Sequence, residues 1–261
     1  MSEIYAIYVF VLGACLGSFA NVVIYRMPEG LSVVKPRSRC PQCKTQLKWI
    51  DNIPILGWVF LRGRCRYCQA AVSWRYPFVE LLMASLFLLN FLIYKDQPYQ
   101  MAEYFIFIFA LVVCTFIDFD HMILPNEFTL SGIVIGLLGS LINPDRSFTE
   151  SLIGVLMGGG FLWALAYFYF LFTKKEGMGG GDIKLLAWIG ALLGFKAIPF
   201  VIMLSAIVGS VVGLIIAARS KTGLKTMIPF GPYLAFGAVV YMFGGQKLAE
   251  WYFHLFLPSL G

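Results

Sequence analysis

Long apolar runs recur along almost the whole chain, and polar or charged residues end each of them. The runs are about 17 to 25 residues long, enough for a helix to cross the roughly 30 Å of hydrocarbon in a bilayer. They begin near Glu3, Tyr76, Met101, Asn126, Thr149, Asp182, Ile198 and Pro229. Strands of a membrane barrel would instead show segments of about ten residues with alternating polarity. The pattern therefore predicts an all-α polytopic membrane protein with about eight transmembrane helices.

Composition agrees with this class. Hydrophobic residues make up 59% of the chain and charged residues 13%, and the mean hydropathy is +0.79. These values exclude an ordinary soluble domain. A polar insert separates the first two apolar runs, and it divides the chain into helix 1 (1–27), the insert (28–74) and the remaining seven helices (75–261).

The distribution of basic residues predicts the orientation of the helices. Ten of the 20 Lys and Arg residues lie between the first two apolar runs, and short basic segments stay on the cytoplasmic side of a membrane. This places the insert in the cytoplasm and, with eight spans, both termini on the opposite side. Topology alone then explains the formal charge of +6, so no nucleic acid partner is needed.

The insert contains two CxxC pairs separated by 21 residues. They are Cys40 with Cys43 and Cys65 with Cys68. This spacing is close to that of zinc ribbons, in which four thiolates surround a tetrahedral Zn²⁺ ion. Disulfides are the competing interpretation, and the reducing cytoplasm disfavours them. Iron is a minor alternative. Four thiolates leave no open coordination position, so we expect a structural metal.

Acidic residues at the ends of apolar runs are the main candidates for chemistry, because carboxylates near hydrocarbon are costly and mark function. "CTFIDFDHMILPNE" (114–127) ends one run with Asp118, Asp120 and His121, and "GMGGGDIKLL" opens another with Asp182. The expected topology places both segments at the cytoplasmic face. Spacing alone does not decide between Asp118 and Asp120, which lie on different sides of a helix.

Two carboxylates that converge at a membrane surface suggest an aspartic protease, with one acting as general base and the other protonated. Three other interpretations stay open at this point. Asp182 can be an ordinary helix N-cap. The chain can also be a zinc-stabilised carrier or channel whose acids line an ion path, or a scaffold whose insert docks a secretion partner.

Six segments of the chain resemble, in order and spacing, the motifs of the bacterial type IV prepilin peptidases. They are "LGSFANVVIYRMP" (16–28), "CPQC" with "CRYC", "SWRYPFVELL" (73–82), "FIDFDHMILP" (116–125), "EGMGGGDIKLLAWIG" (176–190) and "IPFGPYLA" (228–235). The resemblance covers almost the whole chain. It implies a GxGD-class aspartic peptidase in which Gly179, Gly181 and Asp182 form the GxGD motif. It also implies that Asp118, and not Asp120, is the second catalytic aspartate.

The same resemblance implies the activity. Enzymes of this family remove a basic leader from type IV prepilins or type II secretion pseudopilins after a glycine. They commonly then methylate the new N-terminal residue with S-adenosylmethionine, although no cofactor motif is evident here. A peptidase without methyl transfer is the alternative.

The resemblance also implies a location and further site residues. Residues 75–261 would form the catalytic domain, in the bacterial cytoplasmic membrane with the active site at its cytoplasmic face. The cysteine-containing insert favours the bifunctional enzymes. Glu80, an acid within the second apolar run, is a candidate for substrate or cofactor handling.

Overall fold

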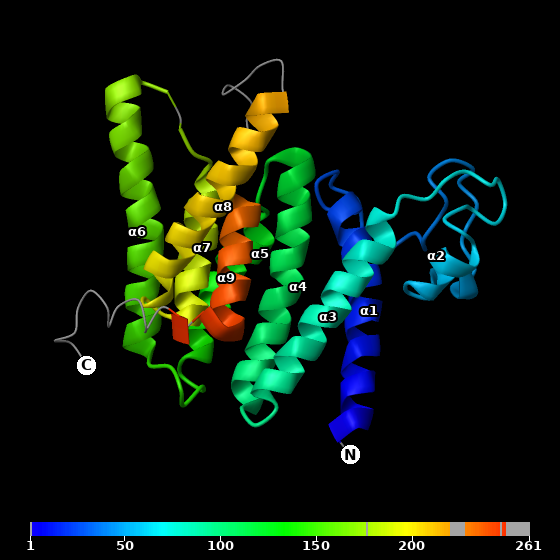
Figure 1. The fold of residues 1–261 in the computed structure, drawn as a ribbon, viewed down its shortest axis with the longest axis horizontal. Helices are drawn as coiled ribbons and strands as arrows, with labels where there is room; N and C mark the ends of the chain where they lie inside the picture. The colour runs from blue at the N-terminus through cyan, green and yellow to red at the C-terminus, as the bar shows by residue number, and fades with distance from the viewer. Residues whose placement is uncertain (1, 176, 220–227, 246, 249–261) are drawn as a thin grey trace. The chain divides into compact units, whose positions relative to one another are not determined.

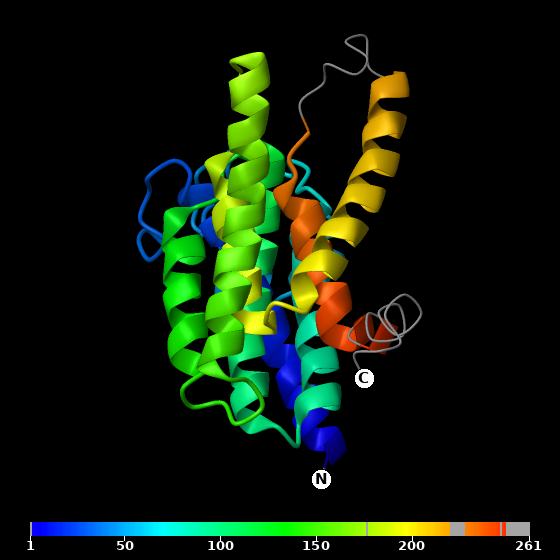
Figure 2. The ribbon, with the colours of Figure 1, turned by 90° about the vertical axis from the view of Figure 1, so that its left-hand side faces the viewer.

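The computed structural model describes residues 2–175, 177–219, 228–245 and 247–248, and within them the regular secondary structure is helical apart from two isolated β-bridges. It forms two compact units, Met1–Val113 and Cys114–Gly261 (Figures 1 and 2). This is a division by packing, and the expected division by function at residues 27 and 74 remains a prediction. Lys221, Lys225 and the end of the eighth apolar run lie outside the described residues.

Unit 1 is built on two long apolar helices, α1 (Ser2–Arg26) and α3 (Arg75–Tyr94). They pack closely because α1 presents two glycines one turn apart. A Cβ atom on Gly13 would lie 2.8 Å from Ala84 Cα, and one on Gly17 would lie 2.7 Å from Glu80 Cα. Small residues at i and i+4 allow this backbone approach in membranes, where lipid and side chains are equally apolar.

The insert connects these two helices and contains little regular structure. It includes the 3₁₀ turn η1 (Trp49–Asn52) and the short helix α2 (Leu56–Phe60). Polar contacts hold its turns together. The Trp58 indole N–H donates to Val72 O over 3.0 Å, and Arg66 forms an ion pair with Asp51 at 2.6 Å. The insert thus relies on few packed side chains, which is typical of small metal-stabilised folds.

Helix α4 (Pro98–His121) begins in unit 1 and ends in unit 2. Its first residue is Pro98, which suits the start of a helix because its missing N–H would have no intrahelical acceptor. The Asn90 side chain of α3 donates to Met101 O over 2.9 Å, and the Tyr94 and Tyr104 rings meet edge to face at 5.0 Å. These contacts fix the α3–α4 hairpin at the end away from the insert.

Unit 2 surrounds one central helix. It contains α5 (Asn126–Gly139), α6 (Phe148–Thr173), α7 (Gly180–Leu193), α8 (Ala197–Arg219), α9 (Gly231–Val240) and the π-helical turn η3 (Tyr241–Gly245). Helix α7 packs against α5, α6, α8 and α9, and every residue from Leu185 to Leu192 is buried. This explains why α7 is apolar on all its faces from Leu185 to Leu192 and has no polar stripe there.

Glycines bring α6 and α7 into backbone contact. A Cβ atom on Gly154 would overlap Gly190 O, and one on Gly158 would lie 2.5 Å from Leu186 O. A Cβ atom on Gly159 would lie 3.2 Å from Ala187 Cβ of α7, a tight contact, whereas Gly160 has nothing near it. The outer face of α6 is rich in exposed aromatic and aliphatic side chains, as expected for a helix facing lipid.

In the part of the chain that the structure describes, five helices are long and apolar enough to cross a membrane, namely α1, α3, α4, α6 and α8. The expected apolar runs all begin within three residues of a helix start. However, α5 and α7 have 14 residues each and α9 has 10, so a straight α5 or α7 spans only about 21 Å. The structure confirms a polytopic helical protein but not the count of eight complete spans.

Candidate active site and metal centre

Asp118 and Asp182 come together in unit 2 from two helix ends. Asp118 lies in the last turn of α4, and Asp182 lies in the first turn of α7. Their exposed fractions are 4% and 8%, and their charges interact. The sequence places them 64 residues apart, so only the fold of unit 2 makes them a pair.

The neighbouring polar residues point elsewhere. Asp120 and His121 are both exposed, although they follow Asp118 by only two and three residues. Residues two apart on a helix face different sides, so the burial of Asp118 requires the exposure of Asp120. The structure thus buries Asp118 and leaves Asp120 exposed, and the choice of Asp118 as the second catalytic aspartate stays a prediction.

The alternative that Asp182 is a helix N-cap is wrong. Gly179 is the N-cap residue of α7, and no side chain caps this helix end. Asp182 is the third residue inside the helix, where a carboxylate is favoured by the helix dipole but is not needed as a cap. Capping therefore does not explain why Asp182 is buried beside Asp118.

Gly231, the first residue of α9, lies directly against Asp118. Its backbone N–H interacts with the Asp118 carboxyl group, and a Cβ atom on Gly231 would lie 2.6 Å from Asp118 Oδ2. Within the described residues, Oδ2 of Asp118 is buried without a hydrogen-bond partner. A buried carboxylate oxygen without a partner needs a reason, and an oxygen that binds water or substrate provides one.

Leu124 separates the two glycine segments around the pair. A Cβ atom on Gly181 would lie 2.9 Å from Leu124 Cβ, and one on Gly231 would lie 3.2 Å from Leu124 Cδ1. By contrast, Gly180 has no neighbouring atom, and a Cβ atom on Gly179 would meet Asp182 Oδ2 only at 3.7 Å. Of the two glycines in the GxGD motif, Gly181 is the one whose missing side chain the packing requires.

The four cysteines of the insert form a second site, in unit 1. Their sulfur atoms all lie within 4.8 Å of one another, and Cys40 Sγ is 3.8 Å from Cys68 Sγ. A tetrahedral zinc ion with bonds of about 2.3 Å would hold its sulfur ligands about 3.8 Å apart. All four are free thiols, so the structure contains no disulfide in competition with this site. The residues fit a Cys₄ metal ion.

The two CxxC turns repeat one geometry. The Cys40 N–H donates to Thr45 O over 2.9 Å, and the Cys65 N–H donates to Ala70 O over 2.8 Å. Lys44 and Gln69, each directly after the second cysteine of its pair, both have positive φ angles, 56° and 59°. Such repeated tight turns hold two sulfur atoms on one side of each turn.

Hydrogen bonds favour the thiolate form of two of these cysteines. The Thr45 side chain and backbone lower the pKa of Cys43 to about 6. The backbone N–H groups of Cys68 and Tyr67 lower the pKa of Cys65. The pKa of Cys68, by contrast, is raised to about 11, because a hydrogen bond with the Ala70 backbone lowers it less than burial and hydrogen bonds with the other three cysteines raise it. The thiolate and not the thiol is the metal ligand, so Cys68 would release a proton when a metal binds.

Glu80 lies apart from the aspartate pair, in unit 1. It is buried on α3, and its Oε2 accepts the Ile55 N–H at 2.6 Å, directly before α2 of the insert. The Ser18 side chain of α1 also hydrogen-bonds to it. Glu80 thus connects both helices of unit 1 to the insert, and it lines a cavity there.

Two residues at the aspartate pair were not predicted as site residues. Leu124 and Gly231 both lie in the family motifs "FIDFDHMILP" and "IPFGPYLA". Their presence in these motifs was the available signal. The spacing of these motifs along the chain does not indicate that "IPFGPYLA" packs against Asp118.

Two family models match the chain. Residues 11–94 match the model of the bacterial peptidase A24 N-terminal domain, and residues 105–214 match that of the type IV leader peptidase family. No solved structure matches the chain significantly.

Relatives named prepilin leader peptidase/N-methyltransferase include proteins of three bacteria. The protein of Aeromonas hydrophila is 38% identical over 95% of this chain and 94% of its own length. The protein of Aeromonas salmonicida (strain A449) is 38% identical over 94% of this chain and 92% of its own length. The protein of Stutzerimonas stutzeri is 34% identical over 93% of this chain and 91% of its own length. Both family models and these nearly full-length relatives agree, and the chain therefore belongs to the type IV leader peptidase family.

Proposed function

We propose that this protein is a membrane-embedded aspartic endopeptidase that cleaves the basic leader from prepilins or pseudopilins after a glycine. We propose further that it methylates the new N-terminal amine with S-adenosylmethionine. The observation that carries the first half is the burial of Asp118 and Asp182 together at two helix ends. The second half rests on the relatives, which are named as both peptidases and N-methyltransferases.

The pair can divide the work of peptide hydrolysis. One ionised carboxylate takes a proton from the attacking water, and the other, protonated, donates to the oxygen of the scissile carbonyl. The proton taken from water then passes to the leaving amine. The Gly231 N–H at Asp118 holds that carboxyl group in one orientation, and Leu124 fills the space beside it.

When bound, S-adenosylmethionine supplies a methyl group on a sulfonium centre. Its transfer leaves a neutral thioether, and the attacking amine releases a proton to solvent. For the metal, Cys40, Cys43, Cys65 and Cys68 would hold zinc, and four thiolates fill its coordination sphere. The ion therefore stabilises the insert and takes no part in hydrolysis.

We place the protein in the bacterial cytoplasmic membrane, with the aspartates and the insert at the cytoplasmic face and the termini outside. The basic residues of the insert support this orientation. The substrate is a basic leader followed by an apolar helix of about 20 residues. That helix can stay in lipid while the leader junction reaches the aspartates.

A carrier or channel is the competing class, and the distribution of acids does not favour it. Among the described residues of unit 2, the buried acids are Asp118 and Asp182 alone, and they form one cluster. An ion path would need polar groups through the depth of the membrane.

Leader release tests the peptidase. Purified protein in detergent is incubated with a prepilin, and we expect Asp118→Asn and Asp182→Asn each to slow leader release by roughly 100-fold or more. Asp120→Asn, the same change at an exposed position two residues away, should cleave like the wild type. Undiminished cleavage in either catalytic variant contradicts the assignment.

Methyl transfer is followed in the same reaction with S-adenosylmethionine labelled on its methyl group. Label in the mature N-terminus supports the bifunctional enzyme. Cleavage without label assigns the chain to peptidases that do not methylate.

A further inference from the structure

The short helix α2 of the insert presents its apolar side chains outward. Leu56, Val59 and Phe60 have exposed fractions of 51%, 53% and 77%. Their positions, i, i+3 and i+4, lie on one face of a helix. An apolar helix face of this kind usually packs against a core, because burial of its surface is favourable. The outward face of α2 therefore lacks a partner within unit 1.

The 3₁₀ turn η1 extends this apolar surface. Trp49 and Ile50 have exposed fractions of 78% and 47%, and η1 packs directly against α2. The close contact is at Gly57, where a Cβ atom would lie 2.5 Å from Asp51 O. Large apolar groups gathered on a surface mark an interaction site. We call the exposed apolar side chains of η1 and α2 the insert face, and they are Trp49, Ile50, Leu56, Val59 and Phe60.

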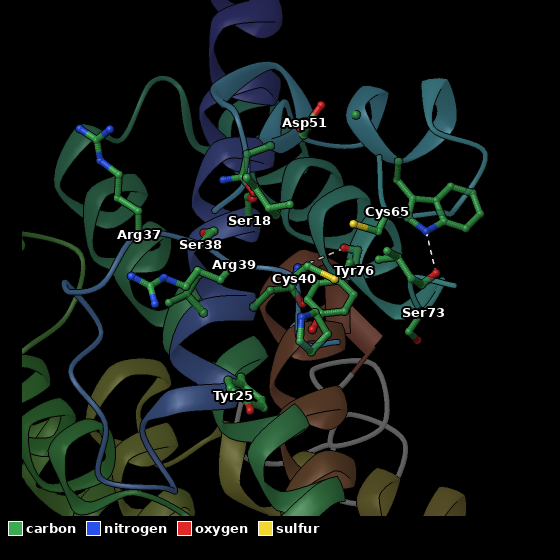
Figure 3. Close-up of a pocket in the computed structure, with 18 of the residues that line it drawn as sticks. Ser18, Tyr25, Arg37, Ser38, Arg39, Cys40, Asp51, Cys65, Ser73 and Tyr76 are labelled. Atoms are coloured by element: carbon green, nitrogen blue, oxygen red, sulfur yellow. Dashed lines mark hydrogen bonds between the residues drawn. The ribbon is translucent and has the colours of Figure 1, made fainter. Parts of the chain in front are cut away.

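The opposite side of α2 faces the interior of unit 1. Gly57 and Trp58 line the cavity between the insert, α1 and α3, which Figure 3 shows around Cys65 and Tyr76. The side chains of the insert face do not line this cavity. The two sides of α2 are thus distinct, with Trp58 directed inward and Phe60 directed outward.

A hydrogen bond to α3 sets the depth of the insert face. The Ile55 N–H, directly before α2, donates to Glu80 Oε2 over 2.6 Å. Glu80 is the sixth residue of α3, which is long and apolar enough to cross a membrane, so it lies about 7.5 Å along that helix from Arg75. Figure 1 likewise shows α2 level with α1 and not beyond its end. Since the headgroup region is about 5–8 Å thick, α2 begins near the boundary between headgroups and hydrocarbon.

The charge around the insert face is positive. Lys48 and Arg62, the basic residues nearest to it in the sequence, are both exposed. Residues 30–75 contain nine Lys and Arg residues and one acid, which is Asp51 and is paired with Arg66. Aromatic and aliphatic side chains next to basic ones are typical of segments that lie in a membrane surface and attract anionic lipids.

We propose that the insert face docks on the surface of the membrane that α1 and α3 cross. Its apolar side chains lie among the upper parts of the acyl chains, and Lys48 and Arg62 bind the phosphates of anionic lipids. The insert is then attached to the bilayer by its own side chains as well as by the two helices. Neither peptide hydrolysis nor methyl transfer gives these side chains a role.

Fluorescence quenching tests whether the insert face contacts lipid. The full-length protein is placed in bilayer discs whose lipids carry bromine on the upper acyl chains. The difference between the wild type and Trp49→Phe gives the signal of Trp49, and Trp58→Phe gives that of the inward indole. We expect brominated lipid to reduce the Trp49 signal about two-fold or more and to leave the Trp58 signal nearly unchanged.

Iodide in the water phase is the complementary quencher. If iodide quenches Trp49 and brominated lipid does not, the insert face lies in water. If neither quencher reaches Trp49, another protein surface covers it, from unit 2 or from a second copy of the chain. Either result overturns the proposal.

Trypsin cleavage after Arg62 in the same discs tests docking without a change of tryptophan. Docking protects this site, and Phe60→Ala removes a large apolar contact with lipid. We expect cleavage about ten-fold faster than in the wild type. Phe172→Ala, the same change at an exposed position of α6, should leave the rate unchanged. The zinc content of each variant is measured to establish that the insert is intact, and an unchanged rate in zinc-loaded Phe60→Ala contradicts docking.

Lipid composition tests the contact with headgroups. We expect cleavage after Arg62 to be slower in discs that contain phosphatidylglycerol than in discs of phosphatidylcholine. Lys48→Gln should reduce this difference about five-fold, as for one basic residue at an anionic surface. Lys95→Gln, at an exposed position at the other end of α3, is the matched control, and cleavage after the exposed Lys174 reports any effect of the lipids on trypsin. Equal rates after Arg62 in both lipids exclude the headgroup contact.

These measurements follow the position of the insert and neither enzymatic activity. A protein that cleaves prepilin while its insert face lies in water overturns this proposal alone. A protein whose insert docks on lipid but releases no leader overturns the proposed peptidase and leaves the docking in place.

Discussion

At the scale of single residues, Asp118 depends on a glycine that is distant in sequence. Gly231 offers its N–H to the carboxyl group and, having no side chain, leaves room for Oδ2. That oxygen is buried without a hydrogen-bond partner among the described residues. A Cβ atom on residue 231 would lie 2.6 Å from it, so any side chain there would displace the carboxyl group.

We expect Gly231→Ala to reduce leader cleavage by about 100-fold, because a displacement of a catalytic group by about 1 Å has this effect. The new Cβ atom would lie 2.6 Å from Oδ2, so the carboxyl group must move. Initial rates of leader release measure it. Gly160→Ala, at a glycine with nothing within contact range, is the matched control and should keep the wild-type rate.

The GxGD motif allows a sharper comparison between neighbouring glycines. Gly181→Ala would place a Cβ atom 2.9 Å from Leu124 Cβ, whereas Gly180→Ala meets no atom. Both changes favour the helix equally in propensity. We therefore expect Gly181→Ala to lower the cleavage rate and Gly180→Ala to retain it, in the same assay. Equal rates for the two variants would exclude a packing role for Gly181.

The sequence predicted some of these residues and not others, for physical reasons. Asp118 and Asp182 stand out because an acid at the end of an apolar run has no apolar explanation. The closeness of Gly231 to Asp118 depends on the return of α9 to the end of α4, and no local pattern encodes it. Arg146 is a similar case. It is one basic residue in a polar segment between two apolar runs, yet it is buried and donates to Leu192 O and Gly136 O.

At the scale of helices, the sequence predicted where each begins but not where several end. The apolar run that contains α7 continues beyond Leu193, yet Gly194 adopts a φ of +77° and ends the helix. Residues with positive φ stop a helix without any change in hydropathy. Hydropathy alone therefore overstates the lengths of α5 and α7, and with them the number of complete spans.

The backbone contact between α6 and α7 allows a direct test of the helix packing. Gly154→Ala would bring a methyl group into Gly190 O, so the helices must separate. Overpacking of this kind lowers the free energy of unfolding by about 1–3 kcal/mol. Thermal unfolding in detergent should therefore show a lower midpoint temperature for Gly154→Ala than for the wild type. Gly160→Ala on the same helix should leave the midpoint unchanged or raise it, since alanine favours helix.

At the scale of the whole molecule, the chain keeps two kinds of site in two compact units. The aspartate pair lies in unit 2, and the four cysteines lie in unit 1. The insert has little packed core, so a metal held by its cysteines would support its shape, whereas unit 2 is held by a central helix that is buried from Leu185 to Leu192. Loss of the metal should therefore act on the insert directly.

Metal analysis with limited proteolysis tests this division. We expect one zinc ion per chain, and we expect Cys40→Ser with Cys65→Ser to abolish its binding, because both sulfur atoms belong to the cluster. Without zinc, the turns around the exposed Arg62, Arg64 and Arg66 should open, and trypsin should cleave there many times faster.

Cys15→Ser is the matched control, since Cys15 is an exposed cysteine of α1 outside the cluster, and it should keep both the zinc and the resistance to trypsin. Digestion followed by mass spectrometry locates each cut. If the metal-free protein resists trypsin at these arginines as the zinc-loaded protein does, the polar contacts of the insert suffice for its fold. The cysteine cluster would then need a role other than stabilisation, because the metal would add nothing to the structure that holds it.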